Sequence, residues 1–329
     1  MHITDLCKSR WRLPNGEFTP LLVPSFSSRG FPNLPRIHDF LSPFITDVSL
    51  VSAFDIHNGY LEPENVYVSD VVIIDSGGYE VKPVNDPLEA YYDERSANNW
   101  CIDLYRETLN KLEPLSDVVI VSHDDSNKIP LEKQVWNARA LFEQYPDFSG
   151  SFLWKPDPEE LYCENTERLV KFEDDIKHFR CFGVTDKELG STLAGRCIKI
   201  KEIRSVFDRL GIELPIHVFG CLDPLTSLLF FLCGADVFDS LSWLRYVYRE
   251  NRLIYLQQAA LLEDNSTLSD YEILSANWID NLETINKAQN AMKIYSQTFD
   301  PNLLYLSDED QRVFRSILDK ICISTEGVL

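Results

Sequence analysis

Short apolar segments alternate with amphipathic ones along most of the chain, and this alternation limits the possible folds more than any other feature. The amphipathic segments have the periodicity of helices and the spacing of crossover connections between parallel strands. The apolar segments are Leu21–Ser25, Val48–Ala53, Val71–Asp75, Val118–Ser122, Ser151–Trp154, Arg180–Val184, Ile216–Phe219 and Ala235–Phe238. The helical patterns include Asn99–Leu112, Leu131–Glu143, Glu159–Phe172, Thr192–Leu210 and Leu222–Leu232. Eight repeated strand-helix units predict a parallel sheet closed into a (β/α)8 barrel, the TIM barrel.

We expect one large barrel domain, residues 1–248, and a helical C-terminal extension, residues 249–329, that packs on it. With 329 residues and 44% hydrophobic content, the chain can bury a sizeable core. Barrels of this kind commonly take about 250 residues as a single domain. From Arg249 onward the sequence is polar and helical in pattern, without repeats.

The predicted strands end in residues that carry chemistry. In such barrels the active site lies at the carboxyl ends of the strands. The residues that fall at those ends are Asp75, His123, Asp124, Lys155, Gly183, Gly220 and Asp239. Their common position predicts one shared site.

The segment VVIIDSGGYEV, Val71–Val81, ends an apolar strand with a carboxylate, two glycines and an aromatic ring. The glycines allow a tight turn and the close approach of a flat ligand, and Tyr79 offers a stacking face. We interpret this segment as part of a ligand site. The alternative is a strand-to-loop turn in which Asp75 caps a helix.

A second segment, HVFGCLDPLTSLLFFLCGADVFDSLSWLRY, His217–Tyr246, delivers Asp239 at the end of a predicted strand. Together the two segments resemble the tRNA-guanine transglycosylase superfamily, whose members carry a DSGG(F/Y)Q segment and a later GxDMFDCVxPTR segment. The spacing from Asp239 to Arg245 equals the family's aspartate-to-arginine spacing, although Trp243 and Leu244 replace Pro-Thr. Weaker similarities at TPLLVPSFSSRG, SLVSAFDIHNGYLEP and SDVVIVSHDD extend the resemblance over residues 19–245.

The resemblance implies that Asp239 is a nucleophile that attacks the sugar C1′ and displaces guanine, which leaves a covalent glycosyl-enzyme. Asp75 would be the general acid and base that protonates the departing guanine and deprotonates the incoming base. This follows the logic of a retaining glycosidase, with a heterocycle nitrogen in place of water. The alternative for Asp239 is a salt bridge or cap at the barrel end.

The resemblance also implies a pair of aromatic side chains that hold the base. Tyr79 would stack on one face of the purine and Phe219, beside Gly220, on the other. Gly183 and Val184 match backbone positions that contact the base edge. Without the resemblance, Tyr79 and Phe219 are ordinary core aromatics.

The polar floor of the base site departs from the family pattern. The family's base-reading aspartate aligns with either His123 or Asp124, depending on a shift of one residue. Asp124 is the better choice chemically, because a carboxylate accepts from both the N1–H and the amino group of guanine. Lys155 stands where the family has a glutamine, which indicates a different incoming base or a different contact to its 7-substituent.

The family's tRNA enzymes carry a zinc subdomain after the nucleophile, with a CxCxxC cluster and a histidine. Here the sequence after Asp239 has one cysteine, Cys322, and no histidine. We therefore expect no zinc subdomain, no metal and no cofactor. The loss argues against the usual tRNA substrate and favours the zinc-free, DpdA-like branch, whose members exchange guanine in DNA for a 7-deazaguanine such as preQ0.

Charge also distinguishes this chain from common nucleic-acid-binding proteins. With 52 acidic and 31 basic residues, its net charge of −21 opposes broad attraction to phosphates. A contact with nucleic acid needs a local basic patch, for which the candidates are Arg245, Arg249 and Arg252, with Trp243 as a stacking group. The alternatives are an exposed basic helix face or a partner protein that supplies the binding surface.

The expected partners are DNA, or alternatively tRNA, and a 7-deazaguanine base. Two other functions stay open: an RNA-guanine transglycosylase that acts with a partner, and a non-catalytic paralogue that binds a deazaguanine or scaffolds an active subunit. No apolar run reaches the roughly 18 residues of a membrane span, and the N-terminus lacks a secretory pattern, so we expect a cytoplasmic protein without membrane contact. The eight cysteines form no CxxC pair, which predicts reduced packing residues.

Overall fold

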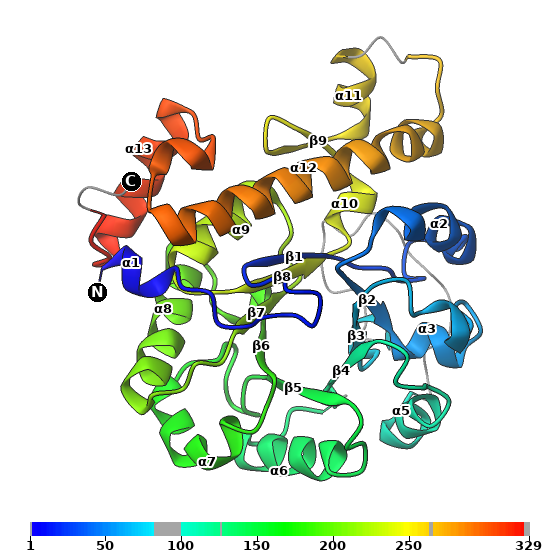
Figure 1. Ribbon diagram of the computed structural model, residues 1–329, viewed down its shortest axis with the longest axis vertical. Helices are drawn as coiled ribbons and strands as arrows, with labels where there is room; N and C mark the ends of the chain where they lie inside the picture. Colours follow the sequence, from blue (N-terminus) through cyan, green and yellow to red (C-terminus); the bar gives the residue numbers. More distant parts are fainter. Residues whose placement is uncertain (1, 82–99, 126, 263–265, 326–329) are drawn as a thin grey trace.

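Eight parallel strands form a nearly closed barrel in the computed structural model, which describes residues 2–81, 100–125, 127–262 and 266–325 (Figure 1). The strands are β1 (Leu21–Pro24), β2 (Val48–Ser52), β3 (Val71–Asp75), β4 (Asp117–Val121), β5 (Ser149–Trp154), β6 (Cys181–Thr185), β7 (Ile216–Phe219) and β8 (Val237–Ser240). Their order is β1-β8-β7-β6-β5-β4-β3-β2. At the seam, Ser25 bridges to Leu50, and the Phe26 N–H donates to the Leu50 carbonyl at 2.9 Å. The predicted (β/α)8 fold is confirmed.

Helices surround the strands on the outside of the barrel (Figure 1). Those between consecutive strands include α2 (Leu34–Leu41), α3 (Ala53–His57), α5 (Ile102–Leu109), α6 (Leu131–Phe142), α7 (Glu173–Ile176), α8 (Leu193–Leu210) and α9 (Pro224–Leu232). The short helices α4 (Gly78–Val81) and α10 (Ser242–Arg245) lie just beyond the ends of β3 and β8. The first residue of the expected helix Asn99–Leu112 lies outside the described residues.

One expected helix is wrong over half of its length. The expected helix Glu159–Phe172 is a loop up to Asn165, a 3-10 helix from Thr166 to Phe172, and then α7. The Cys163 N–H donates to the Glu188 carbonyl at 2.9 Å, so this backbone is tied to the loop after β6 instead of bonding within a helix.

The core has two layers, because each strand buries both of its faces. Val71 and Ile73 of β3 belong to the cluster inside the barrel, whereas Val72 and Ile74 pack outward among the helices. Successive side chains of a strand point to opposite faces, so Asp75 shares the inward side of Val71 and Ile73. The same alternation along β8 puts Asp239 on the inward side of Val237. The barrel geometry therefore turns both predicted catalytic carboxyls toward the barrel axis.

The C-terminal extension begins with a hairpin and continues as helices, which confirms a helical extension on the barrel. Its elements are β9 (Val247–Arg249), β10 (Arg252–Ile254), α11 (Leu256–Leu262), α12 (Asp270–Thr298) and α13 (Asp308–Lys320). The long α12 runs across one side of the molecule, next to β1, α9 and α10 (Figure 1). The Leu22 N–H donates to Gln289 Oε1 of α12 at 2.7 Å, and Asn281 of α12 holds the backbone of Tyr248 and Trp243. The expected division at residue 248 falls inside β9. None of the helices that the structure describes is long and apolar enough to cross a membrane.

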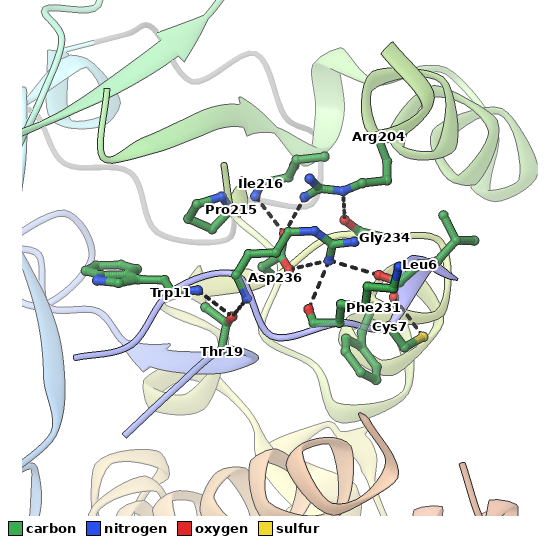
Figure 2. A network of polar contacts seen from close by, with 12 residues as sticks. Leu6, Cys7, Trp11, Thr19, Arg204, Pro215, Ile216, Phe231, Gly234 and Asp236 are labelled. Atoms are coloured by element: carbon green, nitrogen blue, oxygen red, sulfur yellow. Dashed lines mark hydrogen bonds and ion pairs between the residues drawn. The ribbon is translucent and has the colours of Figure 1, made fainter. Parts of the chain in front are cut away.

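A buried ionic network lies at the end of the barrel where the strands begin, opposite the end that carries Asp75 and Asp239 (Figure 2). Asp236, just before β8, accepts from Arg204 of α8 at 2.5 Å, from Arg10 at 2.9 Å and from the Ile216 N–H at 2.8 Å. Arg204 also donates to the carbonyls of Gly234 and Leu214 at 3.0 Å each. This network ties the N-terminal segment and α8 to the starts of β7 and β8.

Candidate active site

Asp239, the predicted nucleophile, lies near the end of β8 and is only 6% exposed. The Ser25 hydroxyl donates to its Oδ2 at 2.7 Å, and His217 Nε2 lies 3.0 Å from its Oδ1. Each carboxylate oxygen therefore has one protein partner. Because a carboxylate oxygen has two lone pairs, each keeps one for another contact.

Asp75, the predicted general acid and base, ends β3 and is partly exposed. The Gly77 N–H donates to its Oδ2 at 3.0 Å. Burial and the nearby charge of Glu80 raise the pKa of Asp75 to about 7, with smaller effects in the same direction from Asp124 and Asp239. The structure thus brings the two predicted catalytic carboxyls within electrostatic reach of each other, and the raised pKa of Asp75 favours its protonated form more than in an ordinary aspartate.

Glu80 is a further carboxyl of this group, and the sequence analysis did not single it out. Its two oxygens accept from the hydroxyls of Ser27 at 2.6 Å and Ser52 at 2.8 Å. Burial and the charge of Asp55 raise the pKa of Glu80 to about 7, against the opposing effect of the two serines. Ser52 is the register partner of Asp75 in the β2–β3 pair, so Glu80 is held next to Asp75.

The two glycines after Asp75 are required by close contacts. Gly77 has a φ of +85°, and a Cβ there would lie 2.7 Å from Trp100 Nε1. A Cβ on Gly78 would lie 2.7 Å from the Cβ of Asp124. The turn therefore brings the backbone of α4 directly against Asp124, which only glycine permits.

Tyr79 is 39% exposed, and two arginines hold it. The guanidinium carbon of Arg29 lies 4.5 Å from the centre of its ring, and Arg29 also donates to the Tyr79 carbonyl. Arg245 donates to the Tyr79 hydroxyl at 2.8 Å. The two arginines therefore fix the position of the Tyr79 ring, and the contact with Arg29 is a cation–π contact.

Phe219, the second predicted stacking residue, faces the barrel interior at the end of β7. Its ring lies over Gly183, where an added Cβ would come within 2.6 Å of Phe219 Cε2. The other neighbour is His217, whose ring is stacked at 3.8 Å between centres, with 24° between the planes. Gly220 follows at the exposed strand end, whereas the side chain of Val184 is buried in the outer core, which leaves only its backbone for a ligand.

Of the two alternatives for the base-reading residue, Asp124 is the one placed with the other site residues. Its carboxylate lies 3.4 Å from Lys155 Nζ, which is also 2.6 Å from Glu188 Oε2. His123 instead packs against Tyr105, with 6.0 Å between ring centres, and its Nδ1 lies 3.5 Å from Asp125 Oδ1. Lys155 thus joins two carboxylates at one place.

The predicted nucleic-acid contacts are dispersed. Arg245 is next to Tyr79, whereas Arg249 and Arg252 are register partners across the β9–β10 hairpin. Arg252 pairs with Asp310 at 2.8 Å, and Arg249 donates to Asn277. The stacking role of Trp243 is wrong, because its side chain is fully buried, donates to the Ser25 carbonyl at 3.0 Å and packs edge-on against Phe26.

Residues that the sequence analysis missed complete the site: Ser25, Arg29, Glu80, Glu188 and His217. A signal existed for two of them, since Ser25 ends a predicted strand and His217 is two residues before Phe219, on the same strand face. Within residues 2–81, 100–125, 127–262 and 266–325, no cluster of three histidine, cysteine or acidic side chains fits a metal ion. The chain matches no protein-family model and no curated protein.

Proposed function

We propose that the protein is a base-exchange transglycosylase that replaces guanine in DNA with a 7-deazaguanine such as preQ0, through a covalent glycosyl ester on Asp239. The observation that carries this proposal is the pair of carboxyls Asp239 and Asp75. One is oriented by two partners, and the other has a pKa near neutrality, as a general acid needs at physiological pH. The resemblance of the two motif segments supplies the reaction class.

In the first half-reaction, a carboxylate oxygen of Asp239 attacks C1′ of the target nucleotide as the bond to the guanine nitrogen breaks. Protonated Asp75 gives its proton to the departing base, which leaves as neutral guanine. In the second half-reaction, the Asp75 carboxylate takes a proton from the incoming base, whose nitrogen attacks C1′ and releases Asp239. The cycle returns both carboxyls to their starting states and needs no cofactor.

The remaining residues bind the base in this proposal. The rings of Tyr79 and Phe219 supply stacking surfaces, and Asp124 accepts from the N1–H and amino group of the base. Lys155 donates toward the 7-substituent. The target base must leave its stack to reach the strand ends, at a cost of a few kcal/mol.

Two alternatives differ in polymer or in class. An RNA-guanine transglycosylase that works with a partner fits the same carboxyl pair, and the net charge of −21 favours a partner for either polymer. A non-catalytic paralogue that binds a deazaguanine has no chemical need for a second carboxyl of raised pKa. The presence of both Asp75 and Asp239 therefore favours the enzyme.

The test is incubation with radiolabelled guanine and, in separate reactions, DNA or tRNA, followed by measurement of label in the polymer. We expect incorporation into DNA, and Asp239→Asn should abolish it because an amide is too weak a nucleophile. Asp103→Asn is the matched control, since Asp103 is 79% exposed on α5. Exchange within about tenfold of wild type in folded Asp239→Asn protein would remove Asp239 from the nucleophile role. Exchange on tRNA alone would overturn the DNA assignment.

A further inference from the structure

Asp239 is held from both sides by the strands that flank it. In the barrel order, β8 lies between β1 and β7, and the register pairs Asp239 with Val23 on one side and Phe219 on the other. Ser25 comes two residues after Val23, and His217 comes two residues before Phe219. One donor for the carboxylate therefore arrives from each neighbouring strand.

We propose that His217 is a positioning residue for Asp239: it fixes the plane of the attacking carboxylate and links that plane to the ring that receives the base. The inference rests on the proposed function. His217 does not touch the substrate in this scheme and acts only through its two neighbours, Asp239 and Phe219.

The geometry requires a particular form of the histidine ring. An ionised carboxylate only accepts hydrogen bonds, so the 3.0 Å contact to Oδ1 needs a hydrogen on His217 Nε2. With the Ser25 hydroxyl on Oδ2 at 2.7 Å, the two donors lock rotation of the carboxylate. A carboxylate with one donor on each oxygen keeps a free lone pair on each, directed away from those donors and available for attack on C1′.

The second neighbour connects the nucleophile to the base site. The His217 ring is 1% exposed and stacks on Phe219 at 3.8 Å, and the absent side chain of Gly183 leaves the space that Phe219 fills. A base that stacks on Phe219 therefore contacts the ring that packs against His217, and His217 in turn contacts Asp239. The residue that contacts the base, Phe219, and the residue that orients the nucleophile, His217, then both lie on the inner face of β7.

Two substitutions of His217 test separately its role as a hydrogen-bond donor and its role as a stacking ring. His217→Phe keeps a flat ring beside Phe219 but removes the hydrogen on Nε2, whereas His217→Gln keeps a donor at a similar reach and removes the ring. We expect His217→Phe to lower kcat for exchange by about 10- to 100-fold, the usual effect of losing a hydrogen bond to a charged group. The KM for the incoming base should change little. His217→Gln should recover most of kcat and raise that KM.

The matched control is the same pair of substitutions at His178, which is exposed on the outside of the barrel. Ser25→Ala removes the other anchor with a small change in volume and should lower kcat in the same way, so the inference remains testable if His217→Phe does not fold. Wild-type kcat in folded His217→Phe protein would overturn the inference and leave the proposed function intact.

A measurement that does not depend on base exchange distinguishes failure of the positioning role from failure of the proposed function. The ¹⁵N shifts of the His217 ring report its tautomer in the free protein, and we expect the hydrogen on Nε2. A hydrogen on Nδ1 alone would overturn the positioning role even if exchange is observed. Absence of exchange on both polymers in the wild type, with the hydrogen on Nε2, would refute the proposed function while the orientation of Asp239 by His217 stands.

Discussion

Asp75, the proposed general acid and base, has a raised pKa that lowers stability above acidic pH. Its carboxyl is surrounded by the charges of Glu80, Asp124 and Asp239, which together with burial raise its pKa from 3.8 to about 7. The native state therefore holds a proton that the unfolded chain releases between these two values. Since the native state binds more protons there, the free energy of unfolding falls as pH rises through this window.

Asp75→Asn should remove this penalty. At pH 8 we expect an increase in the free energy of unfolding on the order of 1–3 kcal/mol, because the amide cannot ionise. The gain should shrink as pH falls and vanish below about pH 4, where the carboxyl is protonated in both states. Urea denaturation at a series of pH values measures this, and exchange should be lost in parallel. A variant that is less stable than wild type at pH 8 would show that Asp75 is structurally favourable in its ionised form.

The sequence predicted individual residues where a strand end carries them directly. Asp75 and Asp239 stand at strand ends in the sequence pattern and in the structure, and Asp124, the chemically preferred alternative to His123, lies beside Lys155. The sequence does not predict the positions of Glu80 and His217 beside the two carboxyls, because these depend on contacts between segments distant in sequence. Trp243 was misassigned because neighbouring arginines suggest an exposed surface, whereas its indole fills the core against Phe26.

At the scale of elements, alternation along the strands explains why the site could be anticipated at all. Inward positions are spaced by two residues, so one known inward residue fixes the others on its strand. The connections between elements are less predictable: the sequence does not reveal that residues 159–165 form no helix and that Cys163 bonds to Glu188 after β6. Such a pairing depends on the assembled barrel and not on local periodicity.

The close packing of β6 against β7 gives a prediction for base binding. Gly183→Ala places a Cβ 2.6 Å from Phe219 Cε2, so the Phe219 ring must shift and the KM for the base should rise by about tenfold. Gly150→Ala is the control, because its Cβ would meet the Phe142 ring at 2.3 Å on the outside of the barrel. That variant should lose stability with the KM unchanged. Equal effects of the two variants on KM would mean that Phe219 does not contact the base.

The ionic network at the strand starts gives a prediction for stability. Arg204→Leu should lower the free energy of unfolding by about 3–5 kcal/mol, because it removes one partner of a buried pair and leaves backbone carbonyls without donors. Arg209→Leu, on the same helix but 55% exposed, should cost less than about 1 kcal/mol. Urea denaturation compares the two. Similar losses would show that the helix, and not the buried pair with Asp236, sets the cost.

At the scale of the whole molecule, the net charge of −21 opposes binding of the proposed nucleic-acid substrate. A net charge of −21 repels phosphates at a distance, so productive docking depends on where the few arginines near the strand ends lie. Arg249 and Arg252 lie opposite each other in the β9–β10 hairpin, which directly follows α10 beyond β8. Arg245 differs from them, because it donates to the hydroxyl of Tyr79, the proposed stacking residue.

The hairpin pair is therefore the cleaner test of docking. Arg249→Gln with Arg252→Gln should weaken DNA binding and reduce its salt dependence by about two units of slope, one for each lost phosphate contact. Arg139→Gln with Arg209→Gln changes the net charge equally on the far helices α6 and α8, and should leave the slope nearly unaltered. Affinity measured against salt concentration on DNA and tRNA provides the comparison. If both pairs change the slope equally, only overall charge matters; if neither does, the acidic chain binds its polymer elsewhere or through a partner protein.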